Sequence, residues 1–181
     1  MENVLKQLSS EKALVAIYTN RSDYDKFAVG FILAVADERI IIHSISPGGD
    51  LDGYTMMNLK KVYRVETEGL YLKKIRKLCE LKGFAKQIYD HNISGDILEN
   101  AIKYAMTNNQ LVTISLDRDA NSIIGYIVDY DNNIVKLLQV SAYGENDGYC
   151  MLSTQEIEEM IINDSDCRDI DLLYKDRYNS E

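Results

Sequence analysis

The feature that most constrains the fold of this chain is an internal repeat with a constant spacing of 95 residues. Val29-Gly30-Phe31-Ile32 corresponds to Ile124-Gly125-Tyr126-Ile127, and Asp52-Gly53-Tyr54-Thr55-Met56-Met57 corresponds to Asp147-Gly148-Tyr149-Cys150-Met151-Leu152. Glycine and Asp-Gly dominate the match, and these residues set turns and bulges in the backbone. The alternative is chance similarity between two β-rich segments. We interpret the pattern as a duplication, so that one fold has to serve both halves.

Each repeat contains short β-rich segments separated by turn residues. The strands expected in the first repeat are 14–19, 27–36, 39–45, 53–58 and 63–66, with one helical turn at 58–62. Those expected in the second are 111–116, 122–129, 134–140 and 148–153, then a helical turn opened by Ser153 and apolar positions at Ile157 and Met160. Five short strands in about 55 residues are too few for a two-sheet sandwich, but they can close a small barrel without exposed edges.

Helical patterns precede and connect these strand sets. The apolar positions are Val4, Leu5 and Leu8 before the first set, and Ile97, Leu98, Ala101, Ile102 and Ala105 before the second. Ser94 is expected to cap the second of these helices, and a further helical stripe at 72–88 is broken at Gly83. The expected fold is α+β and mainly β: two tandem five-stranded small antiparallel barrels, each preceded by a helix. The expected boundaries are 1–70 for the first unit, 71–93 for a helical connector and 94–181 for the second unit.

A leading helix followed by five strands, with Gly30 in the second strand and Asp52-Gly53-Tyr54 entering the fourth, resembles the Sm-like small β-barrel proteins. The helical turn at 58–62 also resembles the Src-homology-type small barrels. The resemblance is one of topology and covers 1–68 and 94–177. Members of the Sm-like family bind RNA through a loop Asn, a stacking residue and a basic–glycine pair near the last strand. This chain has Asp37-Glu38-Arg39 and Arg64-Val65 at those places, so no RNA-binding residue is carried over.

Charge is distributed unevenly along the chain, whose formal net charge is -9. Residues 60–86 hold nine basic and three acidic side chains, and residues 87–181 hold six basic and eighteen acidic ones. Within the basic stretch, Lys73, Lys74, Arg76 and Lys77 are candidates for contact with an anion or a partner. The alternatives are a solvated helix face, or a face that meets the acidic second unit in the same chain or in a homo-oligomer. The net charge favours a basic protein partner over RNA.

Residues that carry chemistry are few. The two histidines, His43 and His91, stand in no metal-ligand spacing, and three scattered cysteines argue against a disulfide framework. Asp50, Asp52 and Tyr54 form a candidate loop site. Cation sites generally require more oxygen ligands than two carboxylates supply, and the alternative is a polar turn. We therefore expect no catalytic residue, no cofactor and no metal.

Tyrosine supplies most of the aromatic side chains, with thirteen tyrosines against three phenylalanines. Tyr18, Tyr24, Tyr63 and Tyr143 fall at expected strand ends or loops, where tyrosine commonly anchors protein interfaces. With no membrane span or signal peptide in the sequence, the expectation is a non-enzymatic cytoplasmic scaffold that binds another protein. The alternatives are an RNA-binding Sm-like regulator and an acidic immunity or antitoxin-type protein.

Overall fold

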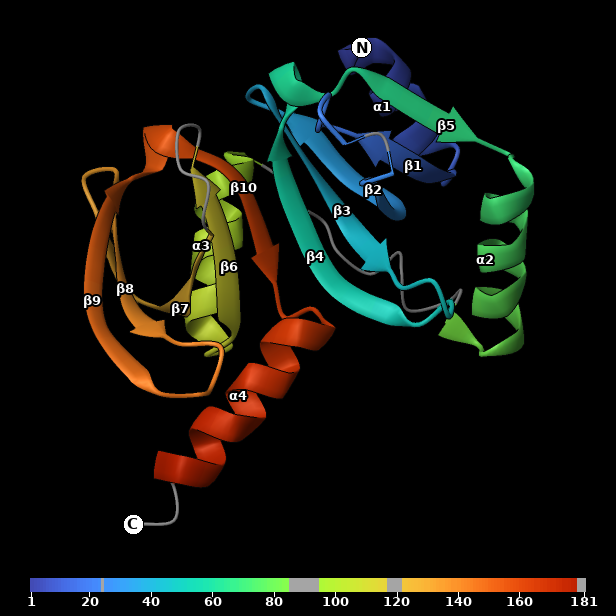
Figure 1. Cartoon of the computed structure of the whole chain (residues 1–181). Coiled ribbons are helices and arrows are strands. Elements are labelled where there is room, and N and C mark those ends of the chain that lie inside the picture. Colours follow the sequence, from blue (N-terminus) through green and yellow to red (C-terminus); the bar gives the residue numbers. More distant parts are fainter. Residues whose placement is uncertain (24, 85–94, 117–121, 179–181) are drawn as a thin grey trace. The chain divides into compact units, whose positions relative to one another are not determined.

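The structure, a computed structural model, describes residues 1–23, 25–84, 95–116 and 122–178 (Figure 1). The chain divides into two compact units, Met1–Ile97 and Leu98–Glu181. The expected helix cap at Ser94 and the histidine His91 lie outside the described residues.

The first unit contains two helices, five strands and one turn of 3-10 helix in its described part. They are α1 (Glu2–Ser10), β1 (Leu14–Tyr18), β2 (Ala28–Ala36), β3 (Arg39–Ile45), β4 (Leu51–Asn58), η1 (Leu59–Lys61), β5 (Arg64–Thr67) and α2 (Leu70–Leu81). Every pairing is antiparallel: β1 pairs with β2 and β5, and β3 pairs with β2 and β4. The strand order is therefore β5-β1-β2-β3-β4.

The second unit repeats this series of elements. Its elements are α3 (Ile97–Thr107), β6 (Leu111–Leu116), β7 (Ile123–Asp131), β8 (Ile134–Val140), β9 (Asn146–Ser153), η3 (Thr154–Glu156), β10 (Ile157–Ile162) and α4 (Ser165–Tyr178). The antiparallel order is β10-β6-β7-β8-β9. The final helix α4 was not expected from the sequence.

The expectation of two separate five-stranded barrels was wrong. The strands form one open antiparallel sheet of ten strands, in the order β5-β1-β2-β3-β4-β10-β6-β7-β8-β9. Closing a barrel needs a hydrogen-bonded ladder between the outer strands of a set, and in the described part of the first unit β5 has a ladder with β1 alone. Hydrophobic alternation predicts the strands and their faces, but it does not determine whether the two outermost strands pair.

The two repeats share backbone conformation as well as sequence. The left-handed turn at Asp37 and Glu38 (φ 50° and 60°) recurs at Asn132 and Asn133 (φ 48° and 64°). A Cβ atom at Gly30 would lie 2.3 Å from the carbonyl oxygen of the neighbouring strand, and the same distance holds at Gly125. The glycines recur because each repeat brings two strands too close together for a side chain.

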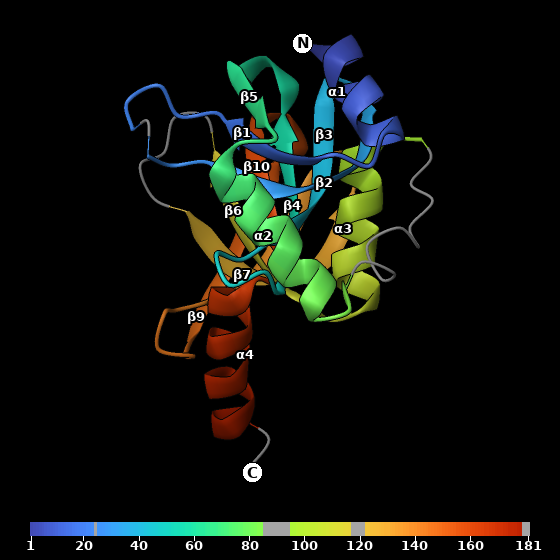
Figure 2. The same ribbon diagram turned by 90° about the vertical axis from the view of Figure 1, so that its right-hand side faces the viewer.

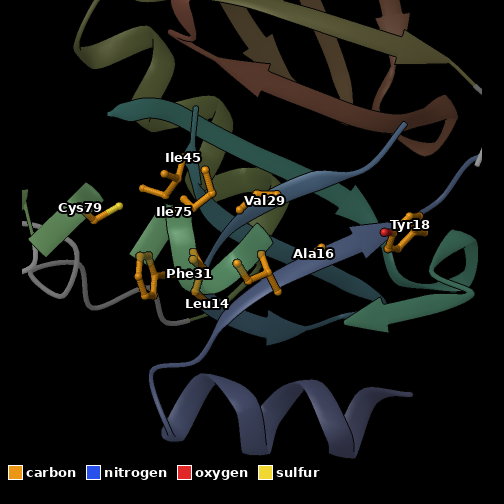
Figure 3. Close-up of a cluster of buried hydrophobic side chains, with 9 residues drawn as sticks. Leu14, Ala16, Tyr18, Val29, Phe31, Ile45, Ile75 and Cys79 are labelled. Carbon is orange, nitrogen blue, oxygen red and sulfur yellow. The ribbon is translucent and has the colours of Figure 1, made fainter. Parts of the chain in front are cut away.

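Strand β1 is buried on both faces because a helix covers each one. Leu14, Ala16 and Tyr18 point into a cluster that includes Ile75 and Cys79 of α2 (Figure 3). The alternate residues Val15 and Ile17 pack in a second cluster with Leu5 of α1. The two helices of the unit are seen apart from each other in Figure 2. This arrangement explains why all five residues of β1 are buried.

Candidate functional site

Four aromatic side chains from separate segments meet at the end of β1. The ring centroids of Tyr18 and Phe27 are 5.0 Å apart, and those of Tyr18 and Tyr63 are 6.3 Å apart. Tyr71, in the first turn of α2, meets Phe27 edge-on at 5.8 Å. Together they form a continuous row of rings that includes the buried Tyr18 and the exposed Phe27 and Tyr71.

Two arginines lie over this row. The guanidinium carbon of Arg21 is 4.7 Å from the Tyr63 ring centroid, and that of Arg64 is 4.6 Å from the Tyr18 centroid. These are cation–π distances. Arg64 is also ion-paired with Glu66, whereas Arg21 has no acidic partner among the described residues. We call Tyr18, Phe27, Tyr63, Tyr71, Arg21 and Arg64 the aromatic–arginine cluster.

Local backbone contacts fix the cluster. The amide of Tyr63 donates a hydrogen bond to the carbonyl of Tyr18 at 3.1 Å, and the Tyr63 hydroxyl donates to the carbonyl of Asn20 at 3.3 Å. The Tyr18 hydroxyl donates to Glu66 at 3.0 Å. Burial, together with this bond to a carboxylate, raises the pKa of Tyr18 above its ordinary value.

The cluster is partly open to solvent. Tyr18 is buried, but Phe27 is 37% exposed and Tyr71 is 40% exposed. Leu70, next to Tyr71, is almost fully exposed. Tyrosine and arginine are among the residues most enriched at the energetic centres of protein interfaces, and here hydrogen bonds and ring contacts hold both kinds of side chain in place.

The predicted basic residues of α2 lie on the same helix as Tyr71. Lys73, Lys74, Arg76 and Lys77 are all exposed, whereas Leu72, Ile75 and Cys79 are buried. Lys77 lies 3.3 Å from Glu80, and Arg76 covers the ring of Phe31 at 5.6 Å. Lys73 and Lys74 have no acidic partner in the described part of the chain. Helix α2 therefore carries both these basic side chains and Tyr71 of the aromatic–arginine cluster.

The residues of the predicted loop site, Asp50, Asp52 and Tyr54, do not share a common set of contacts. Asp50 lies 2.6 Å from the ammonium of Lys82, and the Ser46 hydroxyl accepts hydrogen bonds from the amides of Gly48 and Asp50. Tyr54 stacks on His43 with the centroids 4.6 Å apart, and Asp52 is half-buried. The Asp50 contacts fix the loop between β3 and β4 against the end of α2.

No group of three or more His, Cys, Asp or Glu side chains within 1–23, 25–84, 95–116 and 122–178 is placed to hold a metal ion. No helix in those ranges is long and apolar enough to span a bilayer.

Sequence reasoning placed Tyr18 and Tyr63 at strand ends but did not bring them together, and Tyr24 lies outside the described residues. A usable signal was present in the repeat. At the 95-residue spacing, Tyr63-Arg64 corresponds to Glu158-Glu159, so the shared fold does not itself require an aromatic and an arginine there.

Comparison with known proteins gave no relative: no family model, curated protein or solved structure matches the chain.

Proposed function

We propose that the chain is a non-enzymatic binding protein whose first unit recognises an acidic segment of another protein. The aromatic–arginine cluster carries the proposal. It offers exposed apolar area at Phe27 and Tyr71, and a guanidinium at Arg21 that no described acidic group neutralises. Lys73 and Lys74 extend the positive charge along α2. An acidic segment with apolar side chains complements both properties.

RNA binding is the alternative, and the basic face of α2 is the observation that favours it. Single-stranded RNA is held by stacking of bases on free aromatic faces. Here arginines cover the rings of Tyr18 and Tyr63, and Phe27 and Tyr71 pack edge-on against each other. The covered ring faces favour a protein partner.

The test places a photo-crosslinking phenylalanine analogue at Tyr71 in the full chain and identifies what is captured in the cells that make it. The captured species is then purified and titrated against the chain. We expect Arg21→Glu to weaken binding at least tenfold, because it places a negative charge where the partner is acidic. Leu172→Ser, an exposed change on α4, is the matched control and should bind as the unmodified chain does.

Two results would contradict the proposal. One is capture of RNA, with an affinity that falls by about 0.7 log units per log unit of salt for each phosphate contacted, which would establish the alternative. The other is a purified protein partner whose affinity is the same for Arg21→Glu and for Leu172→Ser.

A further inference from the structure

The second unit carries an exposed apolar face on its outermost strand, β9. In β9, Tyr149 is 60% exposed and Met151 is 67% exposed. Their alternation places both side chains on one face of the strand. The register pairs Met151 with Lys136 of β8, and the ammonium of Lys136 lies 4.7 Å from the Tyr149 ring centroid. Ile134, also exposed, lies on this face of β8.

The equivalent residues of the first unit are covered. Met56, which corresponds to Met151, is fully buried, and Tyr54, which corresponds to Tyr149, is half-buried. The exposure of Tyr149 and Met151 is therefore particular to β9. Large exposed apolar side chains that gather in one place mark interaction sites.

Strand β9 is also an unprotected edge. It stands at the end of the strand order, and among the described residues its ladder is with β8 alone. Exposed edges are usually protected by lysine, proline or shortness. The strand at the other end of the order, β5, has only four residues and carries Arg64 and Glu66. In contrast, β9 has eight residues and contains neither lysine nor proline.

Unneutralised acidic residues flank this face. Asp147 lies on β9 two residues before Tyr149, Asp129 pairs in register with Lys136, and Glu156 follows β9 in η3. All three side chains are exposed, and none has a basic ion-pair partner in the described part of the chain. An apolar strand edge with acidic neighbours is complementary to an extended segment that alternates basic and apolar residues.

We propose that the free edge of β9 accepts an extended basic segment of a partner protein as an added antiparallel or parallel strand. Main-chain hydrogen bonds to β9 would supply affinity, and alternate side chains would supply specificity. Apolar side chains of the segment would cover Tyr149 and Met151, and its basic ones would meet Asp147 and Asp129. This site lies on the second unit and does not depend on the aromatic–arginine cluster.

The probe is a fluorescent eight-residue peptide of alternating lysine and valine, titrated against the full chain by anisotropy. We expect saturable binding, together with slowed amide hydrogen exchange in β9. Methylating alternate backbone nitrogens of the peptide should weaken binding at least tenfold, because those amides can no longer donate. Met151→Ser should weaken it similarly, and Leu172→Ser serves as the control for loss of an exposed apolar side chain elsewhere in the unit.

A second variant, with a reversed charge, tests the proposal if Met151→Ser fails to fold. Asp147→Lys changes an exposed side chain. It should weaken binding of the lysine–valine peptide and strengthen binding of a glutamate–valine peptide of equal length. No binding of the lysine–valine peptide would overturn the proposal, and so would equal binding of the methylated peptide. Self-association of the unmodified chain that Met151→Ser abolishes would also overturn it, because it would assign the edge to a second copy.

Discussion

At the scale of single residues, two equivalent glycines allow neighbouring strands of each repeat to approach closely. At Gly30 and Gly125 a Cβ atom would lie 2.3 Å from a carbonyl oxygen of the next strand, and backbone cannot give way as a side-chain end can. Gly30→Ala should therefore destabilise the chain by about 1–3 kcal/mol, the usual cost of overpacking. Urea unfolding measures this. Gly69→Ala is the control, because nothing lies within 4 Å of its Cβ position; an equal loss for both variants would contradict the prediction.

The three thiols should differ sharply in reactivity. Cys79 and Cys167 are buried, and burial raises the pKa of Cys79 and raises that of Cys167 to about 12. Cys150 is partly exposed. A thiol reagent at pH 8 should label one cysteine rapidly in the native chain and three in denaturant, because only accessible thiolates react. Cys150→Ser should abolish the rapid phase, and a rapid phase that persists in this variant would show that a buried thiol is accessible.

The raised pKa of Cys167 also sets a pH dependence of stability. Its thiol stays protonated in the folded chain at pH values where the unfolded chain ionises, so the folded state binds more protons above about pH 9. The free energy of unfolding should therefore fall as pH rises from 9 towards 12. In Cys167→Ala the free energy of unfolding, measured at each pH, should fall less steeply over that range. An unchanged slope would show that Cys167 does not cause the pH dependence.

At the scale of elements, each repeat ends in a helix that secures the loop between its third and fourth strands. Asp50 pairs with Lys82 at 2.6 Å and Glu145 pairs with Arg177 at 2.7 Å, at the same 95-residue spacing. Each loop glycine has a positive φ, and a Cβ there would lie 2.5 Å from Leu78 or 2.6 Å from Leu173. Both ion pairs are exposed, which makes close backbone packing the stronger of the two attachments.

Because backbone packing holds the loop more strongly than the ion pair does, variants of the two attachments should differ in stability. Lys82→Met and Arg177→Met should each cost less than about 1 kcal/mol, because exposed ion pairs contribute little. Gly49→Ala and Gly144→Ala should cost more, since each adds left-handed strain to a steric clash. Chemical denaturation of the four variants measures the order. A larger loss from either methionine variant than from the alanine variant of the same repeat would reverse the conclusion.

Sequence periodicity accounts for most elements but not for the closing helix or the site. The strands at 39–45, 111–116 and 134–140 coincide with β3, β6 and β8, because apolar runs bounded by turn residues are strong signals. Helix α4 was missed, because exposed Leu172 and Leu173 weaken its amphipathic pattern. The basic face of α2 was predicted from charge and spacing, whereas the aromatic–arginine cluster depends on contacts between segments far apart in the chain, which no local pattern contains.

At the scale of the whole molecule, the two units share one series of elements but have different surfaces. Helix α2 carries four basic side chains and one acidic one, whereas α4 carries three basic and four acidic ones. Arg76 corresponds to Asp171, and Tyr63-Arg64 to Glu158-Glu159. The buried positions keep their apolar character, as at Leu72 and Cys167. The two units thus share their series of elements, while the charge of their surfaces differs.

Two compact units should also respond separately to a lost core side chain. Ile75 is fully buried between α2 and the strands of the first unit, and Ile75→Ala should cost about 2–5 kcal/mol there, because the cavity left by a large-to-small change is only partly refilled. Amide hydrogen exchange resolved by peptide should then show faster exchange in β1 and β2 and an unchanged rate in β6 and β7. The matching variant in the second unit is Cys167→Asp, which places a carboxylate in the core of that unit. It should speed exchange in β6 and β7 and leave the rate in β1 and β2 unchanged. Equal acceleration in both units by either variant would mean that the chain unfolds as one cooperative body, because local opening of one unit leaves the other protected.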